Sequence, residues 1–198
     1  MKILRLVSSA RGEASFSKKL GNAIVEKLQA ANAGSTLKVN DLTSTPFPHL
    51  EEVHLQSFFT PAEGRSPELI EAVKNSDRAI AELKDADVIV IDVPMYNFSI
   101  PSTLKTWIDH IARAGQTFSY GAGGPEGLVK NKKVYLAISS GAVYSEGFMK
   151  PYDFTEPYLR SLLGFLGMTD ITTTRVEGVS MPDLKDNALA TAIEGIVL

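Results

Sequence analysis

Apolar and polar positions divide the chain into two kinds of segment. Short apolar runs typical of buried strands cover Lys2–Val7, Thr36–Leu42, Asp87–Val93, Lys133–Ile138 and Thr169–Val176. Apolar residues at helical spacing predict helices over Ser15–Ala31, Ser66–Leu83, Pro101 to the Arg113–Gly115 stretch, Tyr152–Leu166 and Pro182–Ile196. Strands that alternate with helices predict an α/β fold, in which right-handed crossovers place helices on both faces of a parallel sheet.

One part of the chain departs from this alternation. Thr43 to Pro67 contains four prolines, so we expect a long loop with short helical pieces. We find no internal repeat, low-complexity tract or linker, and 198 residues suit one core. We therefore expect a single domain over residues 1–198. Among doubly wound arrangements we predict the strand order 2-1-3-4-5, which depends more on the motifs below than on periodicity.

Composition excludes several classes of function. The net charge is −3, from 20 basic and 23 acidic residues without a basic cluster, which argues against nucleic acid or anionic membranes as partners. There is no cysteine, so redox chemistry requires a cofactor. The three histidines are scattered, and we expect no metal site. No apolar stretch is long enough for a membrane span and no cleavable leader precedes the first strand, so we expect a cytoplasmic protein.

The loop after the Asp87–Val93 strand is the most informative segment. Pro94, Met95, Tyr96, Asn97 and Phe98 follow a buried strand directly. Ligands of open parallel sheets bind beyond the carboxyl ends of the strands, so a flat cofactor could rest on this loop. The alternative is that the aromatics belong to the core or an interface and that Asn97 is a turn residue.

A phosphate site is predicted after the first strand. This loop has neither the three spaced glycines of a dinucleotide site nor the Gly-Lys-Ser/Thr of a P-loop. It offers Ser9, followed by Ser15, Phe16 and Ser17 at a helix start, where hydroxyls, free amides and the helix dipole favour a phosphate monoester. Ser15 alone could be only a helix cap. A mononucleotide, with its ring system against Met95–Phe98, fits these residues better than a dinucleotide.

The chain also carries motifs of a known family along almost its full length. They are Ser8-Ser9, Ser15-x-Ser17, Pro94-Met95-Tyr96-Asn97-Phe98, Leu104-Lys105, Ala112-Arg113-Ala114-Gly115, Thr117-Phe118, Gly124-Pro125-Glu126-Gly127-Leu128 and Leu163-Gly164-Phe165-Leu166-Gly167. With them the chain resembles the FMN-dependent NADH-azoreductases, within the flavodoxin-like NAD(P)H quinone oxidoreductases. The resemblance implies a flavodoxin-like three-layer sandwich and a homodimer with two sites at the subunit interface.

The resemblance assigns the cofactor contacts as well. It implies that FMN is held by Ser9, by Ser15–Ser17 at the phosphate, by Met95–Phe98 along the ring, and by Ser139, Ser140, Gly141 and Ala142 near the pyrimidine end. Members of the family often have Ser-Arg-Gly-Gly at this last turn. The missing arginine bears on dye or nucleotide preference.

The expected activity is the reduction of quinones and aromatic azo compounds by NADH, in ping-pong two-electron transfer through FMN. FMN carries the chemistry, so no protein side chain is expected to be catalytic. Phe118, Tyr120 and Phe165 are the expected aromatic covers of one apolar slot that serves both substrates. Two alternatives stay open: a flavodoxin-type single-electron carrier, and a non-redox regulatory module on the same fold.

Overall fold

The computed structural model describes residues 1–198 and contains a five-stranded sheet whose neighbouring strands are all parallel. The strands are β1 (Lys2–Val7), β2 (Thr36–Asp41), β3 (Val88–Pro94), β6 (Lys133–Ser139) and β7 (Asp170–Val176), in the order β2-β1-β3-β6-β7. Counted among these five strands, the order is 2-1-3-4-5. The predicted α/β fold and its strand order are confirmed.

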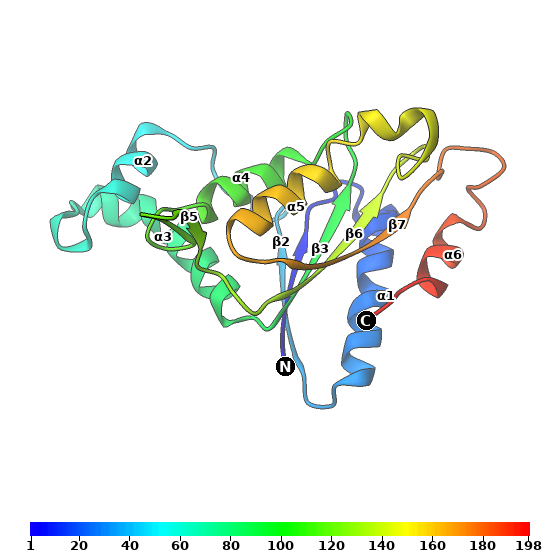
Figure 1. The fold of residues 1–198 in the computed structure, drawn as a ribbon, viewed down its shortest axis with the longest axis horizontal. Coiled ribbons are helices and arrows are strands. Elements are labelled where there is room, and N and C mark those ends of the chain that lie inside the picture. The colour runs from blue at the N-terminus through cyan, green and yellow to red at the C-terminus, as the bar shows by residue number, and fades with distance from the viewer.

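Helices cover both faces of the sheet (Figure 1). On one face, α1 (Phe16–Ala31) and α6 (Ala188–Glu194) enclose a core of 12 buried residues that includes Ile3, Val88 and Val90. On the other face, α3 (Pro67–Asp85), α4 (Ser102–Ile111) and α5 (Glu156–Phe165) enclose a core of 23 buried residues. Successive residues of a strand point to opposite faces, which is why the apolar runs of β1 and β3 supply both cores.

Two helices begin later than their apolar pattern predicts, so those predicted boundaries are wrong. The helix predicted from Tyr152 begins at Glu156, because the Asp153 carboxylate accepts hydrogen bonds from the Thr155 and Glu156 amides and starts the helix there. Gly147–Tyr152 forms a separate 3₁₀ turn. The helix predicted from Pro182 begins at Ala188, after an exposed polar segment that forms turns.

A small antiparallel hairpin was not predicted. It consists of β4 (Phe118–Gly121) and β5 (Gly124–Gly127), two strands of four residues each that are joined at a glycine-rich turn. The expected Thr43–Pro67 loop contains two short helical pieces, α2 (Glu52–Phe59) and the 3₁₀ turn Ala62–Gly64, as predicted. None of the helices combines the length and the apolar character needed to cross a membrane.

Candidate functional site

A narrow cleft lies where β1, β3, β6 and β7 end. Its volume is about 120 Å³. Four loops contribute to its walls, and the lining residues are Ser9, Arg11, Ser15, Phe16, Pro94, Met95, Tyr96, Ser139, Ser140, Gly141, Val179 and Ser180. Because parallel strands all end at the same edge, residues up to about 170 positions apart in the sequence meet here.

The start of α1 forms the polar end of this cleft. The Ser15 hydroxyl accepts a hydrogen bond from the Lys18 amide at 3.2 Å, so Ser15 is the helix cap, and it also lies 3.1 Å from the Ser17 hydroxyl. The amides of Phe16 and Ser17 donate to no acceptor in the protein. Free amides at a helix N-terminus beside a buried hydroxyl pair form a ready site for a phosphate group.

The first loop is joined to the loop after β3 through Tyr96. The Tyr96 hydroxyl lies 3.4 Å from the Ser9 hydroxyl and accepts a hydrogen bond from the Ala10 amide at 3.3 Å. The Ser9 hydroxyl in turn accepts one from the Arg11 amide at 3.3 Å. These contacts fix the position of the Tyr96 ring relative to the polar end of the cleft.

The loop after β3 folds into a tight turn. Tyr96 and Ser99 exchange backbone hydrogen bonds of 2.9 and 3.1 Å, and the two residues between them have positive φ angles, 49° at Asn97 and 70° at Phe98. Asn97 is therefore a turn residue, and its position in the left-handed region suits asparagine. Positive φ is unfavourable for phenylalanine, so contacts around the Phe98 ring must offset the strain.

The third loop follows β6 and is joined to the other two. The Ser139 carbonyl accepts a hydrogen bond from the Met95 amide at 2.8 Å, and the Ser140 hydroxyl donates to the Ala142 carbonyl at 2.8 Å. The amides of Gly141 and Ala142 donate to no acceptor in the protein. This loop thus presents free donors beside the Met95–Tyr96 segment.

Most of the predicted cofactor residues lie together, and four do not line the cleft. Ser17 is fully buried behind Ser15, Ala142 lies beyond the lining, and Asn97 lines a neighbouring cavity of about 510 Å³ together with Lys105 and Tyr158. Phe98 packs instead against Tyr144 and Tyr152, with ring centroids 6.3 and 5.6 Å away.

Three lining residues were not among those predicted: Arg11, Val179 and Ser180. Val179 and Ser180 follow β7, and their amides donate to the carbonyls of Ser140 and Gly141 at 3.3 and 3.0 Å. The strand order already places the end of the fifth strand beside that of the fourth, which is the sequence signal that could have identified them.

The three predicted substrate aromatics form one cluster, away from the cleft of the same chain. The Phe118 ring lies 4.7 Å from that of Phe165 and 5.5 Å from that of Tyr120, which is 74% exposed. Phe98 precedes α4, and its carbonyl accepts a hydrogen bond from the Phe154 amide just before α5. In the cluster, Phe165 is the last residue of α5, and Phe118 and Tyr120 come after the end of α4. Each helix has 10 residues, a length of about 15 Å.

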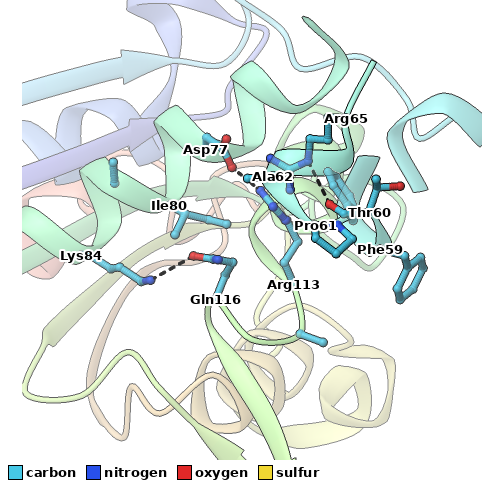
Figure 2. Close-up of a pocket in the computed structure, with 13 residues that line it drawn as sticks. Phe59, Thr60, Pro61, Ala62, Arg65, Asp77, Ile80, Lys84, Arg113 and Gln116 are labelled. Atoms are coloured by element: carbon cyan, nitrogen blue, oxygen red, sulfur yellow. Dashed lines mark hydrogen bonds and ion pairs between the residues drawn. The ribbon is translucent and has the colours of Figure 1, made fainter. Parts of the chain in front are cut away.

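A second, larger cavity of about 600 Å³ lies between α2, α3 and the segment after α4 (Figure 2). Arg113 enters it from that segment, pairs with Asp77 at 2.6 Å and stacks over the Phe58 ring. Lys84 reaches Gln116 at 3.4 Å, and Arg65 donates to the Thr60 carbonyl at 3.1 Å (Figure 2). This cavity does not include the serine-rich start of α1.

The cleft suits FMN by the chemistry of its donors. The unpaired amides of Phe16 and Ser17 and the Ser15 hydroxyl fit a phosphate dianion, and the free Gly141 amide fits the polar edge of a ring. A volume of about 120 Å³ is smaller than the roughly 300 Å³ of small-molecule pockets. The cleft therefore encloses only part of such a ligand, and the rest must lie on the open surface by Tyr96.

Comparison with known proteins agrees with this geometry. A family model described as a flavodoxin-like fold matches residues 1–197. The chain is 48% identical to proteins named FMN-dependent NADH:quinone oxidoreductase from Mesorhizobium japonicum, over 97% of this chain and 92% of the relative, and from Burkholderia thailandensis, over 98% and 97%. The crystal structure of an azoreductase from Bacillus anthracis has a TM-score of 0.91 and 31% identity, over 98% of this chain and 95% of the other. The chain belongs to the flavodoxin-like family of FMN-dependent NADH:quinone oxidoreductases.

Proposed function

We propose that this protein is an FMN-dependent oxidoreductase that uses NADH to reduce quinones and aromatic azo compounds. The observation that carries the proposal is the meeting of four strand-end loops at one cleft, with unpaired amides at Phe16 and Ser17 and a free amide at Gly141. The names of the relatives support the choice of NADH and quinone, and the azoreductase structure supports azo compounds.

The protein's own groups bind and orient. Ser15 and the amides of Phe16 and Ser17 would hold the phosphate, and Tyr96, fixed through Ser9 and Ala10, would position the ring. Bound FMN supplies the redox chemistry by taking two electrons from NADH and passing them to the acceptor. The free amides of Gly141 in the cleft and of Asn97 at the adjoining turn would stabilise negative charge on a bound ring, because donors already fixed in place need no reorganisation. No acid–base side chain is required.

We propose further that the site is completed across a homodimer. Within one chain, the aromatic cluster of Phe118, Tyr120 and Phe165 lies about 15 Å from the Phe98 turn, measured along α4 and α5. A partner subunit can place its own cluster over the ring, which one chain cannot do for itself. A quinone or azo compound would then bind between the ring and the partner's aromatic side chains. The cytoplasmic location stays a prediction.

Purification and titration test the function. The protein should be yellow or take up FMN, and anaerobic NADH should bleach the flavin rapidly. Initial rates against NADH at several quinone concentrations should give parallel lines, as expected for ping-pong kinetics. Intersecting lines would instead indicate a ternary complex. A flavin that NADH does not reduce would favour the single-electron carrier, and a colourless protein that binds no FMN would favour the regulatory module.

A further inference from the structure

Arg175, at the end of β7, is the centre of an ion-pair network that reaches one end of the segment between β6 and α5. Its guanidinium pairs with Asp153 and lies 2.5 Å from a Glu156 carboxylate oxygen, which also accepts from Nε at 3.0 Å. The side chain is only 13% exposed. A largely buried guanidinium that contacts two carboxylates is well suited to fix the positions of the residues that carry them.

The same guanidinium reaches the other end of this segment through Glu177, whose carboxylate lies 3.4 Å from Nη1. Glu177 accepts hydrogen bonds from the amides of Tyr144 and Ser145 at 2.7 and 2.9 Å, and from the Ser145 hydroxyl at 2.5 Å. Arg175 therefore connects residues 144–145 with residues 153–156. The segment between them is held as a closed loop against the edge of the sheet.

An aromatic surface lies on this loop beside the predicted ring position. We call the side chains of Phe98, Tyr144, Phe148 and Tyr152 the aromatic shelf. Phe98 touches both tyrosines, and the Phe148 ring lies 6.4 Å from that of Tyr152. Exposed fractions of 43% for Phe98, 43% for Tyr152 and 84% for Phe148 leave ring area free for a ligand.

The backbone connects the shelf to the cleft at two points. The Phe154 amide donates to the Phe98 carbonyl at 3.0 Å, which joins the loop to the turn after β3. Tyr144 follows Gly141, which lines the cleft, by three residues and Ala142 by two. Phe98 follows Met95–Tyr96 in the turn after β3, so the shelf begins within three residues of the segment on which the ring is expected to stack.

We propose that the aromatic shelf is a binding subsite for the outer ring of an extended aromatic acceptor, and that Arg175 is the positioning residue that holds it in place. This inference rests on the proposed function, since it assigns part of the acceptor to the same site. Single-ring quinones end before the shelf, whereas a two-ring azo compound reaches it. The network thereby sets which acceptors bind well.

The test compares one-ring and two-ring acceptors. In Arg175→Met and in Tyr152→Ala, the KM for 4-hydroxyazobenzene should rise about five- to ten-fold, the effect of one lost aromatic contact. The KM for 1,4-benzoquinone, the KM for NADH and the Kd for FMN should change less than about two-fold by the same reasoning. Equal changes for the two acceptors, or no change for the dye, would overturn the proposal.

Three further measurements keep the result interpretable. Arg160→Met removes another partner of Glu156 without touching the link to Glu177, so it should leave the ratio of the two KM values unchanged.

Glu177→Gln frees only the 144–145 end, and should speed hydrogen exchange at Tyr144 and Ser145 even if Arg175→Met does not fold. Binding of the dye to the FMN-loaded protein without NADH, monitored by quenching of the protein's fluorescence, tests the shelf even if turnover is absent. Equal dye affinity in wild type and Tyr152→Ala would exclude the subsite.

Discussion

Arg5 on β1 and Asp92 on β3 form a buried ion pair beneath the first turns of α1. The guanidinium contacts the carboxylate at 2.6, 3.1 and 3.3 Å, and Asp92 is fully buried. Arg5 also donates to the Lys18 carbonyl at 2.7 Å, while the Asp92 carbonyl accepts from the Ser8 hydroxyl at 2.6 Å. The pair thus joins β1, β3 and the start of α1, three of the elements that border the cleft.

Replacement of one partner of this pair should cost more than replacement of both. Arg5→Met leaves Asp92 buried without its partner, so the carboxyl must either stay charged or take up a proton, and the free energy of unfolding at pH 8 should fall by about 3–5 kcal/mol. Arg5→Met with Asp92→Leu should regain most of that loss, because no uncompensated charge remains. Urea denaturation of the single and double variants measures both. A double variant as unstable as the sum of its single variants would contradict this account.

The pair should also make stability depend on pH. Burial raises the pKa of Asp92 to about 7, against the opposing effect of Arg5. A raised folded-state pKa means that the folded protein binds a proton more tightly than the unfolded chain. The stabilisation that comes from this proton on Asp92 is therefore complete below the pKa of the unfolded chain, near 4, and is lost as pH rises to about 7.

Relative to Asp92→Asn, the free energy of unfolding of the wild type should fall by up to about 1.4 kcal/mol per pH unit across this window and stay level above it. Urea denaturation at pH 4.5, 5.5, 6.5 and 8 measures the difference. A difference independent of pH would mean that Asp92 remains ionised throughout.

Gly21 should be essential for the packing around this pair. A Cβ atom built at Gly21 would lie 1.8 Å from Asp92 Oδ1, so α1 or the carboxylate must move in Gly21→Ala. We expect a loss of about 3 kcal/mol or more. Gly164→Ala in α5 is the matched control, since its Cβ meets nothing within 4 Å and should stabilise the helix by about 0.4–1 kcal/mol. Thermal unfolding of both variants decides; a neutral Gly21→Ala would mean that this contact relaxes freely.

The sheet was predictable because its elements carry local signals: buried strands appear as short apolar runs, and amphipathic helices appear as apolar residues at helical spacing. β1 was predicted to the residue, and β2, β3, β6 and β7 to within one residue at each end. The starts of α5 and α6 were missed because the competing caps and turns depend on single polar side chains such as Asp153. The β4–β5 hairpin was missed because its strands have only four residues each and contain glycine, so they show no alternation of apolar and polar positions.

The site was predictable as far as it follows from strand order. Ser9, Ser15 and Tyr96 meet because parallel strands end at one edge, and the contribution of Val179 and Ser180 follows the same logic. The position of Phe118 and Phe165 was not predictable in this way. Their distance from the cleft depends on the lengths and directions of α4 and α5, which periodicity does not give.

Ser15 should serve both the helix and the phosphate. Ser15→Ala removes the cap of α1 and one phosphate donor, so the Kd for FMN should rise about ten-fold or more, together with about 1 kcal/mol of lost stability. Ser66→Ala is the matched control, because Ser66 caps α3 through the Leu69 amide at 3.3 Å and lies outside the cleft. It should lose similar stability and keep its FMN affinity. Isothermal titration with FMN separates the two roles; equal affinity in both variants would leave Ser15 as a cap alone.

Subunit mixing tests the homodimer proposal directly. Tyr120→Ala with Phe165→Ala removes the aromatic cluster, and Ser15→Asp places a negative charge where the phosphate binds, so each homodimer should have little activity. If one subunit's cluster covers its partner's ring, a mixed dimer contains one intact site, formed by the cleft of the first variant and the cluster of the second. Random reassortment of equal amounts yields about half mixed dimers. About one quarter of the wild-type NADH:quinone activity should therefore return after mixing, as a fraction of sites. Separate dimers without reassortment, formed by mixing at low temperature, provide the control, and no recovery after full reassortment would place the cluster outside the partner's site.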